Sequence, residues 1–401
     1  MGGPQPIMLP VPNRLATAVA IVAALSGGCA GLRYTNTAPF VERHLRATAE
    51  EVPAVAFKTI VLYPARDYLT FDWLWRLLWG DEAWNAEGGG VADGSFYANR
   101  SPAELTPAAV ARGPCVGPPP CPPITVERVK RSGGSAGFVG TDANGRTFLF
   151  KPDHPDYPEL GSSAAVIGSR ILWALGYDVP PVYLVRIEGT GDPPPAGFDG
   201  RRASASLYLD GVRGRFKFDW FRYRREVRAL RMACAWINDT DRIGTNSLVI
   251  EREGRARYVL VDFNSCLGSW NGQPKEPWRG HRHEWDLGEF VVGLVTLGLV
   301  HAPYDPDQPT VSPAVGRFDA RFDPMRWRSQ LPNTAFDRMT GSDLRWIAGK
   351  MAELDRRHVA AIVAEAELTD PADAEYLIDT LMQRRATILS AAHLPSAPPD
   401  G

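Results

Sequence analysis

The stretch that most constrains the fold is residues 236–264, WINDTDRIGTNSLVIEREGRARYVLVDFN. It follows a helix candidate at 220–237, and its apolar segments predict strands at 247–251 and 257–263. Asp241 and Asn246 lie in the loop before the first strand, and Asp262 lies near the end of the second. A carboxylate at the mouth of a strand is suited to hold Mg²⁺, although an aspartate there can also cap the next turn. The order of helix, loop and strands favours one site containing all three residues.

A second polar group lies upstream, on a glycine-rich turn and the strand after it. The turn 132–137 contains Gly133, Gly134, Ser135 and Gly137, and glycines allow backbone amides to approach phosphate oxygens. Lys151 ends the apolar strand 147–151, which follows a hairpin turn at 142–145. A lysine on a buried strand needs an anionic partner, and a nucleotide phosphate is one. The alternatives are an ordinary turn and a lysine whose ammonium group reaches water.

The remaining elements extend this pattern in both directions. A strand is predicted at 124–129, a helix from Ser162 to Leu175 ended by Gly176, and a strand at 179–187. Further helices are predicted at 283–299, 340–367 and 371–391. We therefore expect an α+β, bilobal fold with a small β-rich lobe at 115–195 and a larger, mostly helical lobe at 196–395. A helical extension at 30–114 would precede them.

The region from Ile124 to Leu389 resembles bacterial proteins with HipA-like or phosphoinositide-kinase-like (atypical kinase) catalytic domains. The matching segments are GGSAGF (133–138), FKPD (150–153), RILWALGYDVPPVYLV (170–185), AWINDTDRIGTNSL (235–248) and VLVDFNSCLGS (259–269). The resemblance implies a kinase-like fold that binds ATP and Mg²⁺ or Mn²⁺ between its lobes. It implies that Lys151 holds phosphates, that Asp241 is the catalytic aspartate, and that Asn246 and Asp262 bind the metal.

One position departs from this pattern. The helix after the lysine strand should offer a glutamate to Lys151, and Ala165 stands at the matching place, with Glu159 upstream as a substitute. Three functions therefore stay open. They are a phosphotransferase with an undefined acceptor, a catalytically inactive scaffold of the cell envelope, and a nucleotidyl (AMP) transferase on the same fold.

The N-terminal segment predicts export. Arg14 precedes the apolar run 15–25, and small residues then lead to Cys29, as in a secretory signal. Cys29 also fits a lipoprotein signal, which would attach the chain to a membrane, while a helix packed on the body is the alternative. In an oxidising compartment Cys115 and Cys121 could close a small loop, and Cys234 and Cys266 are expected to be buried thiols.

Composition and two side-chain clusters complete the predictions. The formal net charge of -2 gives no basic field for nucleic acid. The aromatic segment 71–79 is expected to pack on the main domain, with contact to a membrane surface as the alternative. The basic segment 213–231 is expected to form an exposed helix face, or a face for anionic lipid or substrate. His281 and His283 lack the spacing of a zinc hydrolase motif.

Overall fold

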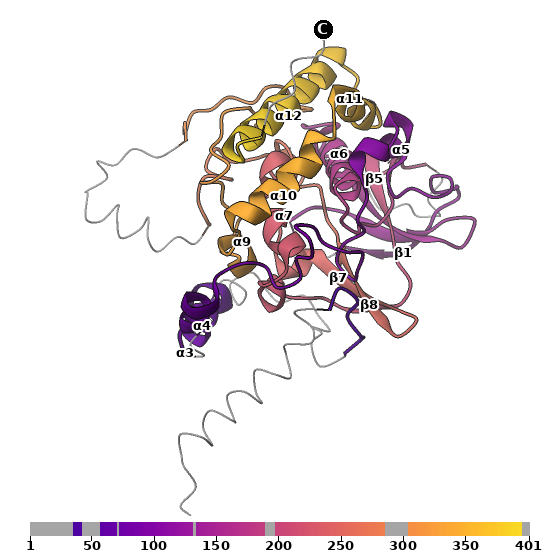
Figure 1. Cartoon of the computed structure of the whole chain (residues 1–401). Coiled ribbons are helices and arrows are strands. Elements are labelled where there is room, and N and C mark those ends of the chain that lie inside the picture. Colours follow the sequence, from indigo (N-terminus) through magenta and orange to yellow (C-terminus); the bar gives the residue numbers. More distant parts are fainter. Residues whose placement is uncertain are drawn as a thin grey trace, which may run out of the picture.

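The computed structural model describes residues 35–41, 57–69, 72–130, 134–188, 197–284 and 304–394. The predicted signal at 1–29 with Cys29, Gly133 of the glycine-rich turn, and nearly all of the helix predicted at 283–299 lie outside these residues. Within them the chain forms a β-rich lobe and a larger, mostly helical lobe (Figure 1). The predicted α+β, bilobal fold is confirmed, and the predicted strands and helix of the small lobe follow one another in the expected order.

The small lobe is built on a five-stranded antiparallel sheet of order β1-β2-β3-β5-β4. Its strands are β1 (Thr125–Val129), β2 (Phe138–Thr141), β3 (Thr147–Pro152), β4 (Val182–Arg186) and β5 (Arg202–Leu207). The predicted hairpin joins β2 to β3, with Thr141 opposite Thr147 and Gly145 in the left-handed region at φ 76°. Phe138 and Phe150 stack at 4.8 Å in the core of this lobe. Strand β5 comes after residue 195, so the sheet takes a strand from beyond the predicted range of the small lobe.

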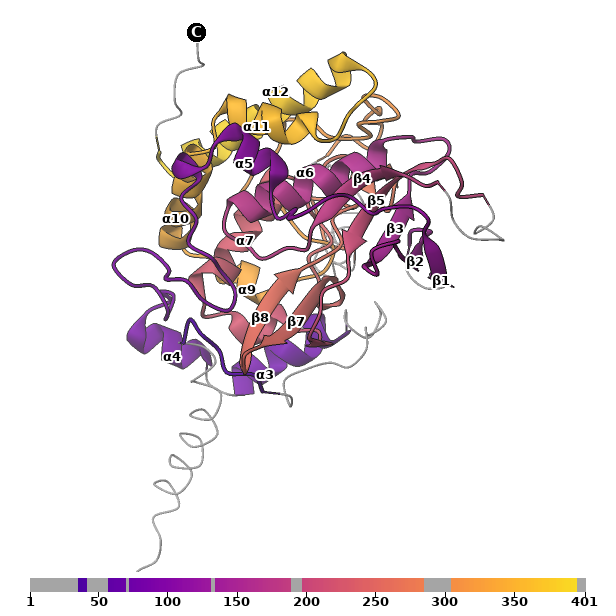
Figure 2. The same cartoon turned by 90° about the vertical axis from the view of Figure 1, so that its right-hand side faces the viewer.

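Helix α6 (Leu160–Ala174) lies along this sheet and also contacts the helices α5 and α11 (Figure 2). Almost every residue of α6 is buried, because one side faces the strands and the other faces helices. The helix ends at Gly176 as predicted, with φ 103°. A Cβ at that position would lie 2.3 Å from the Tyr97 ring, so both the backbone angle and the close contact require glycine.

The large lobe combines a small sheet with helices. Its strands are β6 (Val212–Gly214), β7 (Ser247–Arg252) and β8 (Arg255–Leu260), followed by the hairpin β9 (Ser269–Trp270) and β10 (Gln273–Pro274). Its helices are α7 (Arg225–Trp236), α9 (Thr334–Asp337), α10 (Gly341–Ala352), α11 (Arg356–Ala364) and α12 (Pro371–Ala391). The single helix predicted at 340–367 is wrong, because the Asp355 carboxylate accepts the His358 N–H and starts a new helix.

Most of the basic segment 213–231 is buried, which contradicts the predicted exposed helix face and the alternative of a face for anionic lipid. Residues 218–221 form a short 3₁₀ turn (η4, Phe218–Phe221), and α7 begins later than predicted, at Arg225. Its aromatic side chains at Phe216, Phe218 and Tyr223 belong to the core. Its arginines form ion pairs inside the protein, such as Arg224 with Glu226 at 2.6 Å and Arg228 with Asp343 at 3.6 Å. This segment is therefore neither an exposed helix face nor a lipid-binding surface.

The described part of the N-terminal extension wraps around the large lobe. It contains η2 (Lys58–Leu62), α3 (Tyr63–Leu69), α4 (Asp72–Trp79), η3 (Pro102–Glu104) and α5 (Pro107–Arg112), with irregular chain between α4 and η3. The irregular part contributes buried rings, because Phe96 stacks on Tyr258 and Trp84 stacks on Tyr223, each at 3.9 Å.

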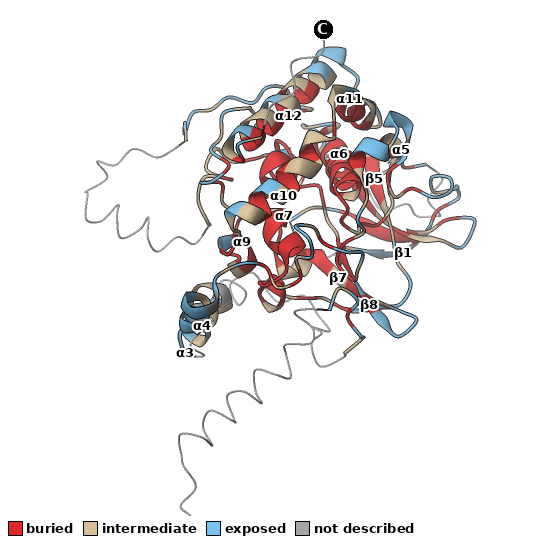
Figure 3. Cartoon of the chain, in the orientation of Figure 1, coloured by how far each residue is buried: buried red, intermediate tan, exposed pale blue. Residues whose placement is uncertain are grey.

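Helices α3 and α4 expose much of their apolar surface (Figure 3). Leu69 of α3 is 73% exposed, and Trp73, Leu77 and Leu78 of α4 are 44%, 75% and 61% exposed. The predicted packing of the segment 71–79 on the main domain is therefore wrong for these three side chains of α4. The two helices are nevertheless attached to the large lobe, because Arg66 donates two hydrogen bonds to the Asp219 carboxylate, at 2.9 and 3.0 Å. Among the described residues, no helix is long and apolar enough to cross a membrane.

The four cysteines in the described ranges are free thiols. The predicted loop closure between Cys115 and Cys121 is wrong, since the Cys115 thiol is buried and donates to the Val182 carbonyl at 3.4 Å, while Cys121 is exposed. Cys234 and Cys266 are buried, as predicted.

Candidate functional site

The predicted site residues come together where the two lobes meet. Lys151, at the end of β3, donates to the Asp262 carboxylate at 2.6 Å and to Asn264 Oδ1 at 3.2 Å. Lys151 is only 8% exposed, so its charge needs the carboxylate partner that Asp262 offers. Because Lys151 belongs to the small lobe and Asp262 to the large lobe, this ion pair connects the lobes.

Asp262 has an unusual backbone conformation for a residue with a side chain. It follows β8 at φ 65°, in the left-handed region, which costs free energy and is concentrated at functional sites. Arg242 supports this conformation by donating to the Val261 carbonyl at 2.8 Å and also to the Asp262 carbonyl. The Arg242 guanidinium also lies over the Phe263 ring, 5.1 Å from its centroid. The protein thus fixes the direction in which the Asp262 carboxylate points.

Asp241 and Asn246 lie in the loop that follows α7. The Asn246 amide donates to the Asp241 carbonyl at 2.8 Å, which leaves its Oδ1 available to a cation. The Val261 N–H donates to the Asn246 carbonyl at 3.1 Å. Hydrogen bonds therefore join the loop of Asp241 and Asn246 directly to the chain that carries Asp262.

The two aspartates have opposite pKa shifts. Burial, and after it the negative charge of Asp262, raise the pKa of Asp241 to about 7. Burial alone would also raise the pKa of Asp262, but Lys151, Lys130 and Arg242 outweigh it and hold that pKa below its usual range. Neighbouring carboxylates whose pKa values are pushed apart are typical of acid–base and metal-binding sites.

The glycine-rich turn closes over the strand of Lys151. At Gly137 a Cβ would lie 2.5 Å from the Phe150 carbonyl oxygen and 3.5 Å from Lys151 Cγ. At Gly134 a Cβ would lie 2.3 Å from the Asn271 amide nitrogen. Side chains at these positions would push the turn away from the site. Ser135 also belongs to this turn, and its Oγ accepts a hydrogen bond from Lys130 at 3.3 Å.

Two further cations lie near the site. Lys130 lies just before the glycine-rich turn, and burial together with repulsion from Lys151 lowers its pKa. Burial also lowers the pKa of Arg215, against the attraction of the nearby Asp262. Lys130 was not predicted as a site residue. Arg215 directly follows β6 and belongs to the basic segment 213–231, for which a face toward anionic substrate was one of the alternatives.

The expected carboxylate partner from the helix is absent among the described residues. Ala165 occupies the matching place, and Glu159 is not a substitute, because its carboxylate accepts the Thr369 N–H at 3.0 Å. Asp153, of the FKPD segment, instead fixes the start of α6 by accepting the Ser162 N–H at 2.7 Å. The prediction that Glu159 could pair with Lys151 is therefore wrong, and Asp262 takes that role.

The donor set suits a metal ion that arrives with phosphates. Among the described residues, no group of three or more His, Cys, Asp and Glu side chains could hold a metal by itself. Asp262 and Asn246 offer oxygen ligands beside the lysines. Mg²⁺ is usually bound by one or two carboxylates together with substrate phosphates, so this arrangement fits Mg²⁺ or Mn²⁺ with a nucleotide. Nδ1 of His283 forms a hydrogen bond of 2.7 Å with the Ser329 carbonyl oxygen.

Solved structures similar to this chain include kinases. The proinflammatory kinase CtkA of Helicobacter pylori is 11% identical, with 69% of this chain and 97% of that chain covered and a TM-score of 0.39. The Golgi casein kinase is 12% identical, with 68% and 74% covered and a TM-score of 0.28. Its structure with Mn/ADP bound has the same identity and coverage and a TM-score of 0.25. No protein-family model matches this chain, and no curated protein matches it. The activity must therefore be argued from the geometry of the site.

Proposed function

We propose that the chain is an ATP- and divalent-metal-dependent phosphotransferase of the atypical kinase type. The observation that carries this proposal is the Lys151–Asp262 ion pair of 2.6 Å between the lobes, with Asp241 and Asn246 held beside it by the same hydrogen-bonded loops. This constellation supplies the parts that phosphoryl transfer needs, which are a lysine for phosphates, oxygen ligands for a metal and a carboxylate near the acceptor.

Each side chain has a distinct role in this proposal. Lys151, with Lys130 and the amides of the glycine-rich turn, would bind the nucleotide phosphates. Asp262 and Asn246 would hold a divalent cation, which would offset the negative charge of the phosphates. Asp241 would accept a hydrogen bond from the acceptor hydroxyl and orient it. It would then take the hydroxyl proton as the acceptor oxygen bonds to the γ-phosphorus, the bond from that phosphorus to the bridging oxygen breaks, and ADP leaves. Catalysis would depend mainly on positioning and charge neutralisation.

The charge arrangement supports binding of an anionic substrate. Lys130, Lys151 and Arg215 surround the two aspartates, and burial lowers the pKa of Lys130 and of Arg215. Triphosphate oxygens would stabilise their charged forms. The mass added to the product separates this proposal from nucleotidyl transfer, since one reaction adds a phosphoryl group and the other adds AMP.

Nucleotide binding is expected to depend on Asp262. For the wild-type chain with Mg²⁺, an ATP analogue at one hundred times its Kd should add about 2.7 kcal/mol of stability, measured by thermal unfolding. Asp262→Ala removes a metal ligand, so the metal-dependent part of this gain should disappear. Asp210→Ala, at an exposed aspartate, is the matched control and should keep the full gain. An unchanged gain in Asp262→Ala would rule out the proposed metal site.

We also propose that the enzyme works at the cell envelope and is attached to a membrane through Cys29. The apolar run 15–25 before Cys29 supports export, and the exposed apolar side chains of α3 and α4 support contact with a lipid surface. The turn η2, which directly precedes α3, adjoins the Asp241 loop, because Ile60 packs on Ile243 and Leu331. The acceptor would then be reached at the membrane.

The anchor can be tested by replacing its residue. Labelling of cells with a radioactive fatty acid should mark the wild-type chain and leave Cys29→Ser unmarked, with most of the variant moving from the membrane to the soluble fraction. Cys121→Ser, at an exposed cysteine, is the control and should stay labelled. A wild-type chain without label would contradict lipid attachment.

A further inference from the structure

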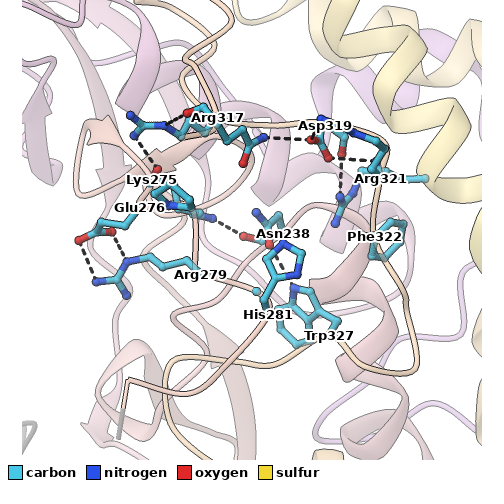
Figure 4. A pocket seen from close by; sticks show the side chains of 14 residues that line it. Asn238, Lys275, Glu276, Arg279, His281, Arg317, Asp319, Arg321, Phe322 and Trp327 are labelled. Carbon is cyan, nitrogen blue, oxygen red and sulfur yellow. Dashed lines mark hydrogen bonds and ion pairs between the residues drawn. The ribbon is translucent and has the colours of Figure 1, made fainter. Parts of the chain in front are cut away.

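A positively charged cavity lies in the large lobe, apart from the Lys151–Asp262 pair (Figure 4). It is partly open to solvent, and the space that the centre of a water-sized molecule can occupy in it is about 30 Å³. Its walls come from Asn238 behind the Asp241 loop, from the segments 275–281 and 308–327, and from α12. Distant parts of the sequence therefore contribute to one cavity.

The side chains of this wall carry an excess of positive charge. The cations are Lys275, Arg279, Arg317, Arg321 and Arg384, and the carboxylates are Glu276 and Asp319. Of these two carboxylates, Glu276 already pairs with Arg279. Asp319 accepts a hydrogen bond from Gln308 at 2.9 Å and lies 3.6 Å from Arg321. Among the described residues, the other cations of the wall have no carboxylate partner within ion-pair distance.

Lys275 is the clearest case of an unbalanced buried charge. It is 1% exposed, and its ammonium donates to the Asn238 carbonyl and, at 2.8 Å, to the Ser265 carbonyl. Both partners are neutral groups. Asp239 acts on Lys275 only from a greater distance and is itself paired with Arg242 at 2.7 Å. An ammonium held only by carbonyls inside a protein is costly unless an anion lies nearby.

Arg384, on α12, is a second buried cation whose hydrogen-bond partners are neutral carbonyl groups. It is 3% exposed and donates to the carbonyls of Trp236 at 2.9 Å, Ala235 at 2.6 Å and Asp319 at 2.8 Å. The first two carbonyls are at the C-terminus of α7, where the helix dipole is equivalent to roughly half a negative charge. Half a charge does not balance Arg384 and Lys275 together, so positive charge remains in the cavity.

A third observation points to a missing acceptor. Arg279 is 7% exposed and lies between two indole rings, 3.3 Å from the Trp270 centroid and 4.3 Å from the Trp278 centroid. Its Nη1 is buried and has no hydrogen-bond partner among the residues that the structure describes. A buried guanidinium nitrogen without an acceptor is expected to bind one from outside.

We propose that this cavity is a binding site for a small tetrahedral oxyanion of the phosphate or sulfate type. Residues with guanidinium and ammonium groups line the cavity from the segments 275–281 and 308–327 and from α12, and such groups match the several acceptor oxygens of such an anion. Lys275 would connect the anion to both sides of the catalytic region, because it bonds to Asn238, just before Asp241, and to Ser265, just after Asp262. The anion would thus stabilise the two loops that carry the proposed site.

The test uses the full chain in metal-free buffer at constant ionic strength, titrated with inorganic phosphate in a calorimeter. Lys151→Met is the background, because it removes the lysine of the nucleotide site and leaves the cavity intact. We expect saturable phosphate binding in this background, sulfate in competition with it, and no comparable binding of chloride. Adding Lys275→Met should weaken phosphate binding by about ten- to a hundredfold, the size of one charge-assisted hydrogen bond.

A second pair of variants covers the case in which Lys275→Met does not fold. Arg321 and Arg326 are both exposed arginines, with side chains 84% and 82% exposed, but only Arg321 lines the cavity. Arg321→Ser should weaken phosphate binding by a few fold, and Arg326→Ser should leave it unchanged. Equal phosphate affinity in all cavity variants, or no phosphate binding, would overturn the proposal. Because Lys275 and Arg321 do not belong to the nucleotide site, a change of phosphate affinity in their variants is assigned to the cavity.

Discussion

Replacing Asp241 with asparagine is expected to lower the rate of phosphoryl transfer by about 10²- to 10⁴-fold. Asparagine keeps the size of the side chain, but it cannot accept the proton of the acceptor hydroxyl. The metal ligands Asp262 and Asn246 are unchanged, so nucleotide binding should persist. The rate is measured as ADP release with Mg²⁺ and ATP, with water or the protein itself as the acceptor. Full activity in Asp241→Asn would remove Asp241 from the mechanism.

The pH dependence of the rate tests the same residue. Burial and the Asp262 charge raise the pKa of Asp241 to about 7 in the metal-free chain, and only the carboxylate form can take a proton. The wild-type rate should therefore rise with pH and level off, with a midpoint at or below 7, since a bound cation favours the carboxylate. The residual rate of Asp241→Asn should not show this step. A flat wild-type profile between pH 5 and 8 would contradict the assignment.

The same shift has a consequence for folding. The folded chain holds the Asp241 proton more tightly than the unfolded chain, whose aspartate has its ordinary pKa of 3.8. The resulting contribution to stability is complete below that value and is lost as the pH rises through about 7. The metal-free wild-type chain should therefore lose more stability over this range than Asp241→Asn does.

The parts of the fold that could be predicted from sequence are those set by local patterns. The β2–β3 hairpin follows from apolar strands around Asp142–Gly145, and α6 ends where Gly176 allows a positive φ. Helix α12 has the predicted bounds, Pro371–Ala391, because Asp370 caps it and Pro371 fits its first turn. In each case the deciding residues lie within a few positions of the element.

The predictions that were wrong concern charged side chains whose partners are distant in sequence. The basic segment 213–231 resembles an exposed surface when taken alone, and it is buried because Asp343, more than a hundred residues later, pairs with Arg225 and Arg228. Glu159 is near Lys151 in sequence, but the fold turns it toward Thr369. Charged side chains can be placed only when their partners are known.

The candidate site also has parts that local sequence patterns predict and parts that only distant contacts determine. Lys151, Asp241, Asn246 and Asp262 were predicted because their spacing matches a known pattern, and the structure brings their segments together. The cavity around Lys275 and Arg384 has no such pattern, since it is assembled from several segments. The left-handed conformation of Asp262 also had no sequence signal, because most left-handed positions are taken by glycine.

Arg242 is the residue whose loss is expected to destabilise the chain most. It is fully buried, pairs with the equally buried Asp239 at 2.7 Å, and donates to the carbonyls of Asn246, Val261 and Asp262. Arg242→Met would leave the Asp239 charge unpaired inside the protein, which typically costs about 3–5 kcal/mol. Urea unfolding followed by fluorescence measures this loss. Mg²⁺-dependent nucleotide binding should also weaken, because the backbone at Asp262 loses its support.

A double variant separates the two effects of Arg242. Adding Asp239→Leu to Arg242→Met removes the unpaired charge, so the double variant should recover much of the lost stability. Nucleotide binding should stay weak, because the carbonyls of Val261 and Asp262 still lack their donor. If the double variant recovered both properties, Arg242 would only balance the charge of Asp239. If it recovered neither, the stability of this region would depend on the hydrogen bonds to the carbonyls and not on the ion pair.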